Sequence, residues 1–207
     1  AYAHWVDRHL AVQRLLHFTY NTIQIQIVLP LLVLAIFNRI GELRAYLLAF
    51  TLALGATIVI SALLPAAGPI VFANQASFHT LKFTGATPLD HLTQLREAGP
   101  LIFTQTPGGI ATFPSFHSTI AILTPLSLRR HHRTFMAVLV LDGFMLLGTI
   151  TEGAHYLTDV IAGSAMAFLA YAVASAILRR EDARGAEHLR ASGPAGCTVR
   201  GRAQVSA

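Results

Sequence analysis

Long apolar runs, separated by short basic segments, constrain this sequence more than any other feature. Hydrophobic residues make up 54% of its 207 residues and charged residues only 12%. The charged residues lie between the runs, and the runs are longer than the core helices of soluble proteins. Because a chain in lipid must satisfy its backbone hydrogen bonds internally, such runs predict helices. The sequence therefore predicts an all-α fold, a polytopic transmembrane helix bundle.

Five transmembrane spans are visible in the pattern of apolar runs. They are predicted at residues 15–37, 46–64, 114–128, 135–150 and 156–178. Pro30, inside the first of them, is expected to kink the helix because proline cannot donate a backbone hydrogen bond.

The predicted domain organisation is one transmembrane domain followed by a tail. The domain covers residues 1–178, and within it residues 65–109 form a long connection whose apolar content favours a packed lid or interfacial helices. Residues 179–207 are rich in Gly, Ala, Arg and Ser and lack apolar periodicity. This tail is predicted to be disordered.

The distribution of basic residues predicts the orientation in the membrane. If the five spans alternate, 11 Lys and Arg residues fall on the side of the tail and 4 on the side of residues 65–109. Without the three arginines beyond Arg184 the count is 8 against 4. The positive-inside rule places the tail in the cytoplasm. The starts of the third and fifth spans then share the extracytoplasmic side.

The formal charge of +5 and the pI of about 10.0 raise the question of a nucleic-acid partner. The basic residues lie in short loops and in the tail without the interleaved aromatic residues of a nucleic-acid platform, so membrane lipids are the expected partners. The single cysteine, Cys197, cannot form an internal disulfide. No CxxC, HExxH or glycine-rich nucleotide motif is present, and no cofactor or metal is predicted.

Two short polar stretches, residues 112–118 and 153–159, stand at the mouths of apolar runs, where polar groups are costly unless they are functional or paired. In a helix His155 and Asp159 would share a face, so the carboxylate would accept a hydrogen bond from one imidazole nitrogen and aim the other outward. Such a nitrogen is an oriented nucleophile or base. The alternative is a purely structural hydrogen bond.

A second imidazole, His117, would be able to protonate a leaving oxygen. Ser115 and the free N–H groups at the start of the third span would bind phosphate oxygens, since a helix N-terminus favours anions. Together with His155 and Asp159, these groups are sufficient for phosphoryl transfer without a metal.

The segment FPSFHS at residues 113–118, followed by HYLTDVIAG at residues 155–163, resembles the second and third signature motifs of the type 2 phosphatidic acid phosphatase superfamily. It is most similar to the bacterial branch related to inositolphosphorylceramide synthases. The resemblance implies His155 as nucleophile, Asp159 as its orienting partner, His117 as acid and Ser115 as a phosphate contact. It also implies six spans in the full chain.

The sequence departs from the family pattern around the phosphate. The first motif is absent, because the position seven after Lys82 is Leu89 rather than Arg. Gly148 and Thr149 replace the Ser-Arg pair that precedes the third motif, and Phe116 stands where phosphatases have Gly. We expect Phe116 in the substrate site. Arg96 is the first candidate and Lys82 the second for the phosphate-binding cation; a solvated loop charge is the alternative for both.

Two further acidic residues lie near the predicted spans. Asp142, in the middle of the fourth span, is expected to form a structural hydrogen bond with polar groups of the first span. Glu152 either tunes the charge of His155 or faces water.

The resemblance implies a metal-independent membrane phosphatase or phosphotransferase that acts on a lipid phosphate or diphosphate. The intermediate would be a phosphohistidine, at the extracytoplasmic face of a bacterial inner membrane. Within the family, the alternative is transfer of a phospho-headgroup to a lipid alcohol, as inositolphosphotransferases do. From another class, a bis-histidine haem or metal protein stays open, as does an inactive scaffold.

Overall fold

The computed structural model of the protein describes residues 2–64, 66, 68–69, 112–152 and 155–191. All regular elements in this part of the chain are helices, which confirms the predicted all-α fold. They are α1 (Tyr2–Asp7), α2 (Leu10–Asn21), α3 (Ile23–Ile36), α4 (Ile40–Leu63), α6 (Phe116–Leu128), α7 (His132–Thr151) and α8 (Leu157–Ala191).

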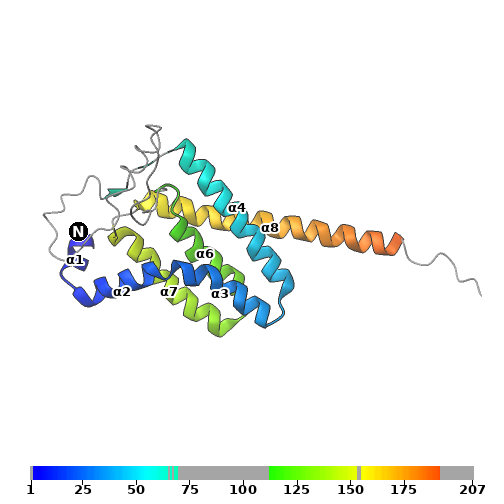
Figure 1. Ribbon diagram of the computed structural model, residues 1–207, viewed down its shortest axis with the longest axis horizontal. Coiled ribbons are helices and arrows are strands. Elements are labelled where there is room, and N and C mark those ends of the chain that lie inside the picture. Colours follow the sequence, from blue (N-terminus) through cyan, green and yellow to red (C-terminus); the bar gives the residue numbers. More distant parts are fainter. Residues whose placement is uncertain (1, 65, 67, 70–111, 153–154, 192–207) are drawn as a thin grey trace, which may run out of the picture.

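Helix α6 lies at the centre of the bundle and packs against α3, α4, α7 and α8 (Figure 1). Its buried side chains include several hydroxyls, which would be costly in an apolar interior without partners. They are satisfied by backbone carbonyls: Ser127 Oγ donates to Leu123 O at 2.8 Å, and Thr119 Oγ1 donates to Gly163 O in α8 at 3.0 Å. These bonds allow a helix with a polar N-terminal half to lie inside the bundle.

The hydrophobic core surrounds α6. Its buried members are Leu34, Tyr46, Ala49, Leu123, Leu128, Val138, Ala167 and Ala174. The small alanines on α4 and α8 allow close packing of these helices. The hydroxyl of Tyr46 donates to Ile27 O at 2.8 Å, which ties α4 to α3.

Three helices are long and apolar enough to cross a membrane: α4, α7 and α8. Helices α2 and α3 pass the same test together but are bent by 53°, so they add a fourth if they form one span. The α6 helix has 13 residues, which at about 1.5 Å per residue is shorter than the roughly 30 Å of a bilayer core. By length and composition, the described residues thus provide three or four candidate spans. Large exposed apolar side chains, such as Ile25, Val59 and Phe168, fit contact with lipid.

The first predicted span breaks at Thr22 and not at Pro30, where a kink was expected. The hydroxyl of Thr22 donates to Thr19 O at 2.6 Å, and Gln26 Nε2 donates back to that hydroxyl at 3.0 Å. Local side-chain bonds of this kind compete with the helical pattern. Helix α3 continues through Pro30.

Helix α8 extends past the end of the predicted domain and projects beyond the bundle (Figure 1). The predicted disordered tail begins at residue 179, but the chain remains helical to Ala191. Ala, Arg and Glu favour a helix here, and Arg44 of α4 contacts Glu181 at 3.0 Å and Asp182 at 3.8 Å. Residues 192–207 and most of the predicted lid, 65–109, lie outside the described residues.

The basic segments gather at one end of the bundle. Arg130, after α6, lies 3.3 Å from Glu42 at the start of α4. Arg129 donates to the hydroxyl of Tyr171 in α8 at 2.9 Å. Helices α6 and α8 begin at the opposite end, where the two polar stretches of the sequence lie.

Candidate active site

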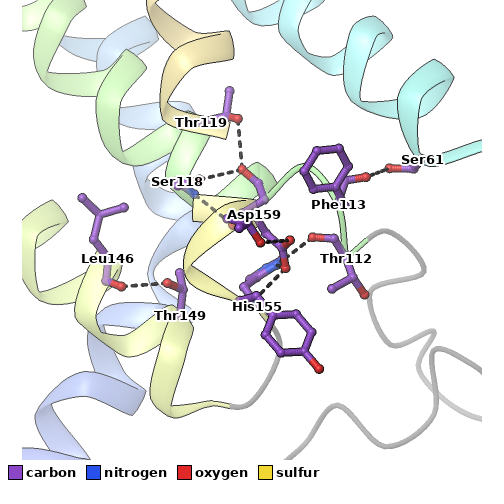
Figure 2. A network of polar contacts seen from close by, with 12 residues as sticks. Ser61, Thr112, Phe113, Ser118, Thr119, Leu146, Thr149, His155 and Asp159 are labelled. Carbon is purple, nitrogen blue, oxygen red and sulfur yellow. Dashed lines mark hydrogen bonds and ion pairs between the residues drawn. The ribbon is translucent and has the colours of Figure 1, made fainter. Parts of the chain in front are cut away.

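The N-termini of α6 and α8 meet, and this brings the two polar stretches together (Figure 2). The amide of Ser115 donates to Asp159 O at 3.1 Å, and the ring centroids of His117 and His155 are 5.9 Å apart. Gly163 makes this approach feasible, because a Cβ at that position would collide with the carbonyl oxygen of Ser115 and the hydroxyl of Ser118. The expected convergence of the two stretches is confirmed.

The imidazole of His155 is oriented by a backbone carbonyl. Its Nδ1 lies 2.8 Å from Thr112 O and 3.9 Å from Asp159 Oδ2, the latter beyond hydrogen-bonding distance. A carbonyl only accepts, so Nδ1 carries the proton and, in the neutral ring, Nε2 has a free lone pair. The expected hydrogen bond to Asp159 across a shared helix face is replaced by this contact, because α8 begins only at Leu157.

His155 is buried, with 4% of its surface exposed. Burial lowers the pKa of His155 from its ordinary value of 6.5, and the hydrogen bond to Thr112 and the charge of Asp159 oppose this shift. The lowered pKa keeps the imidazole neutral at neutral pH.

Asp159 holds the start of α8 together. Its Oδ2 accepts from the amide of Tyr156 at 2.7 Å, and its Oδ1 accepts from the hydroxyl of Thr158 at 3.4 Å. A carboxylate in the first turn of a helix is also stabilised by the helix dipole. The result is a buried negative charge fixed within 4 Å of the His155 ring.

The segment that carries the Thr112 carbonyl is anchored to α4. Ser61 Oγ donates to Phe113 O at 2.8 Å (Figure 2), and Thr112 is 4% exposed. Thr112 opens the first polar stretch, but the sequence assigned no role to it or to Ser61, because their roles depend on backbone carbonyls, for which the side-chain pattern carries no signal.

Ser115 serves as the N-cap of α6. It is fully buried, and its Oγ accepts from the amide of Ser118 at 3.4 Å. The predicted phosphate contact through this hydroxyl is therefore in competition with a structural role. The amides of Phe116 and His117, in the first turn, have no partner within the helix.

The two aromatic side chains after Ser115 point to different helices. Phe116 makes an edge contact with Phe50 of α4, at a centroid distance of 6.0 Å. His117 stacks on Tyr20 of α2, at 4.1 Å between ring centroids and 11° between planes. Both are half-buried. Tyr20 was missed at the level of sequence, since a tyrosine in an apolar run is typical of ordinary packing.

Glu152 lies near the site but is buried rather than facing water. Its Oε1 is 3.2 Å from His17 Nδ1 of α2, and the residue is 5% exposed. Burial raises the pKa of the Glu152 carboxyl above 4.5, and the hydrogen bond and charge of His17 oppose this. His17 was another residue without a sequence signal.

The remaining predicted residues do not join the described site. Arg96 and Lys82 lie outside the described residues. Asp142 is buried, and neither of its carboxylate oxygens has a hydrogen-bond partner among the described residues, so the hydrogen bond expected with polar groups of the first span is not found there. In this part of the chain, no group of three or more His, Cys, Asp or Glu side chains is arranged to hold a metal ion.

Comparison with known proteins adds a family to this geometry. The family model described as the PAP2 superfamily matches residues 1–173, which include the helices up to the first half of α8. No curated protein and no solved structure matches the chain. The match covers most of the 207 residues and both polar stretches. The chain therefore belongs to the PAP2 superfamily.

Proposed function

We propose that this protein is a membrane phosphatase or phosphotransferase that acts on a lipid phosphate or diphosphate through a phosphohistidine. Membership of the PAP2 superfamily supports the general class, since its members are phosphatases or phosphotransferases. The observation that carries the proposal is the hydrogen bond of His155 Nδ1 to Thr112 O at 2.8 Å. It leaves Nε2 as the free nitrogen, in a site that also contains His117.

In the proposed reaction, Nε2 of His155 attacks the phosphorus atom and the bond to the leaving oxygen breaks. His117 gives a proton to that oxygen, and the phosphoryl group stays on His155. Water or an alcohol then attacks the phosphohistidine and gives its proton to His117. The charge of Asp159 stabilises the positive imidazole formed in the first step.

The phosphate oxygens would lie at the N-termini of α6 and α8. The amides of Phe116 and His117, which have no partner within α6, favour an anion there, and they act without reorganisation in a site with little water. Ser115 supports them as the cap of α6. Arg96, and next Lys82, stay our candidates for the cation that neutralises the phosphate.

The proposed topology has five spans, with α6 as the short central one, and a site at the extracytoplasmic face of a bacterial inner membrane. The gathering of arginines at the opposite end of the bundle supports this orientation. Cysteine variants at Leu157 and Ala183, with Cys197 changed to Ser, test it with a membrane-impermeant maleimide. Leu157→Cys should react in intact cells and Ala183→Cys only after lysis. The reverse pattern would overturn the orientation.

A second candidate is transfer of a phospho-headgroup to a lipid alcohol, as in the inositolphosphorylceramide synthase branch. It is favoured by the burial of His155 and Asp159, which are only 4% and 3% exposed, because a site with little water protects the intermediate from hydrolysis. Phe116 in place of Gly points in the same direction.

The decisive experiment uses purified protein and radiolabelled lipid phosphates, with and without an alcohol acceptor. Wild type should form an acid-labile, alkali-stable phosphoprotein, and His155→Ala should form none and lose turnover. His132→Ala, an exposed histidine at the other end, is the matched control. Full activity of His155→Ala would overturn the proposal. Free phosphate as product favours the phosphatase, and a new lipid ester favours the transferase.

A further inference from the structure

Among the described residues, Tyr20 of α2 is the aromatic side chain that stacks on the imidazole of His117. The two rings are nearly parallel, at 11°, with centroids 4.1 Å apart. Within the described residues neither ring nitrogen of His117 has a hydrogen-bond partner, whereas His155 Nδ1 has the Thr112 carbonyl. The second torsion of histidine is broad, so without a contact the ring plane would vary. The stacking on Tyr20 is what selects the plane.

Tyr20 is itself held in place by the contact of α2 with α7. A Cβ at Gly148 would lie 2.9 Å from Leu16 O and 3.5 Å from Tyr20 Cβ, so the glycine admits the backbone of α2. Next to it, His17 is paired with the buried Glu152 at 3.2 Å. Two contacts about one turn apart at the end of α7 therefore fix the part of α2 that carries Tyr20.

A proton donor in phosphoryl transfer must present one nitrogen to the leaving oxygen within hydrogen-bonding distance. His117 makes a 57° angle with the ring of His155, so the two imidazoles direct their nitrogens along different lines. Rotation of the His117 ring would move its nitrogens away from the oxygen that leaves the phosphorus atom as His155 Nε2 attacks it. Control of this plane thus bears on leaving-group protonation and not on nucleophilic attack.

We propose that Tyr20 is a positioning residue for His117, whose aromatic face holds the imidazole in the plane required to protonate the leaving group. The inference rests on the proposed function. The contact is made by the ring face of Tyr20 rather than by its hydroxyl. Phenylalanine should therefore retain the positioning role, and an aliphatic side chain should lose it.

The test compares two phosphate monoesters in kcat/KM, which reports formation of the phosphoenzyme. An alkyl phosphate, such as a short-chain phosphatidate, needs protonation of its leaving oxygen, whereas p-nitrophenyl phosphate releases a stable phenolate. In Tyr20→Leu, kcat/KM for the alkyl ester should fall on the order of 10- to 100-fold, within the range of general acid catalysis, and kcat/KM for the aryl ester should fall less than about threefold. Tyr20→Phe should recover most of the loss.

Two controls separate the inference from the function on which it rests. Phe18→Leu changes an aromatic side chain of the same helix that is 64% exposed, and it should leave kcat/KM for both esters unchanged. His155→Ala should abolish both activities; if it does not, the proposed function fails. His117→Gln should show the same preference for the aryl ester as Tyr20→Leu.

The inference is overturned if Tyr20→Leu leaves kcat/KM for the alkyl ester unchanged, or if it lowers kcat/KM for both esters by the same factor. Either result counts when His155→Ala is inactive and His117→Gln loses more activity on the alkyl ester than on the aryl ester. If Tyr20→Leu does not yield folded protein, Tyr20→Met carries the same test, since it retains apolar bulk without an aromatic face. A selective loss in Tyr20→Met, recovered in Tyr20→Phe, supports the positioning role.

Discussion

The Nδ1 atom of His155 lies 2.8 Å from the carbonyl oxygen of Thr112. Thr112 precedes α6 in the sequence, whereas His155 follows α7. Asp159 Oδ2, at 3.9 Å, contributes charge without a hydrogen bond. Orientation and electrostatic support of the imidazole are thus divided between two groups. In a Ser-His-Asp triad one carboxylate supplies both.

Asp159→Asn should therefore be milder than the equivalent change in a triad, where the loss is about 10⁴-fold. We expect a loss of roughly 10- to 100-fold in kcat, because the Thr112 carbonyl still sets the tautomer. The charge of Asp159 raises the pKa of His155, so its removal lowers that pKa further below 6.5. The nucleophile must be unprotonated, hence the acid limb of kcat/KM should move to lower pH. A shift to higher pH, or a loss near 10⁴-fold, would contradict this division of roles.

Gly163→Ala should separate the N-termini of α6 and α8. The added Cβ would meet the backbone carbonyl of Ser115, which cannot move without unwinding the start of α6. We expect a loss of about 1–3 kcal/mol in the free energy of unfolding and a large loss of activity. Gly143→Ala in α7 is the control, since a Cβ there meets nothing within 4 Å. It should stabilise by about 0.5–1 kcal/mol. Thermal unfolding in detergent measures both, and equal effects would contradict the close approach at Gly163.

Ser115→Ala should destabilise the protein by about 1 kcal/mol, the usual effect of losing an N-cap. If the hydroxyl serves only as a cap, KM for the lipid phosphate should not change. The control is Ser127→Ala, at the other end of α6, which removes a buried hydroxyl bonded within the helix at 2.8 Å. An increase in KM specific to Ser115→Ala would show that the hydroxyl also binds phosphate.

Glu152→Gln should change the dependence of stability on pH. The pKa of Glu152 is raised in the folded protein, so the folded state binds more protons than the unfolded state between pH 4.5 and the raised value. Wild type loses stability as the pH rises through this window, and the glutamine variant should not. Between pH 4 and 8, the melting temperature of the variant should rise relative to that of wild type as the pH increases. The opposite trend would mean that the ion pair with His17 outweighs burial.

Asp142→Leu should increase thermal stability in detergent. The Asp142 carboxylate is 2% exposed and has no hydrogen-bond partner among the described residues, and leucine is its apolar shape analogue. The expected gain is about 1–3 kcal/mol, the usual penalty for an unsatisfied buried group. Asp182→Asn, at an exposed site, should change little. A lower melting temperature for Asp142→Leu would reveal a bound ion or water at the carboxylate.

Much of the architecture follows from the sequence because it depends on local physics. The apolar runs specify helices wherever the backbone must bond internally, and the helices α4, α7 and α8 lie where those runs lie. The arginine clusters mark the end at which the loops gather. The helix boundaries follow less closely from the sequence: α8 continues to Ala191, past the predicted end at residue 178, and Glu181 and Asp182 of this extension contact Arg44 of α4.

The sequence by itself determined that His117, His155 and Asp159 stand at the starts of two apolar runs, and the motif spacing identified the superfamily. Only the tertiary structure decided what holds them. Thr112 orients His155 through a backbone carbonyl, Tyr20 stacks on His117 from α2, and Gly163 lets α6 and α8 touch. Gly163 belongs to the segment that resembles the third signature motif, but the sequence does not show which atoms it meets. Each of these contacts joins atoms from distant segments, and their proximity is set by helix packing rather than by residue type.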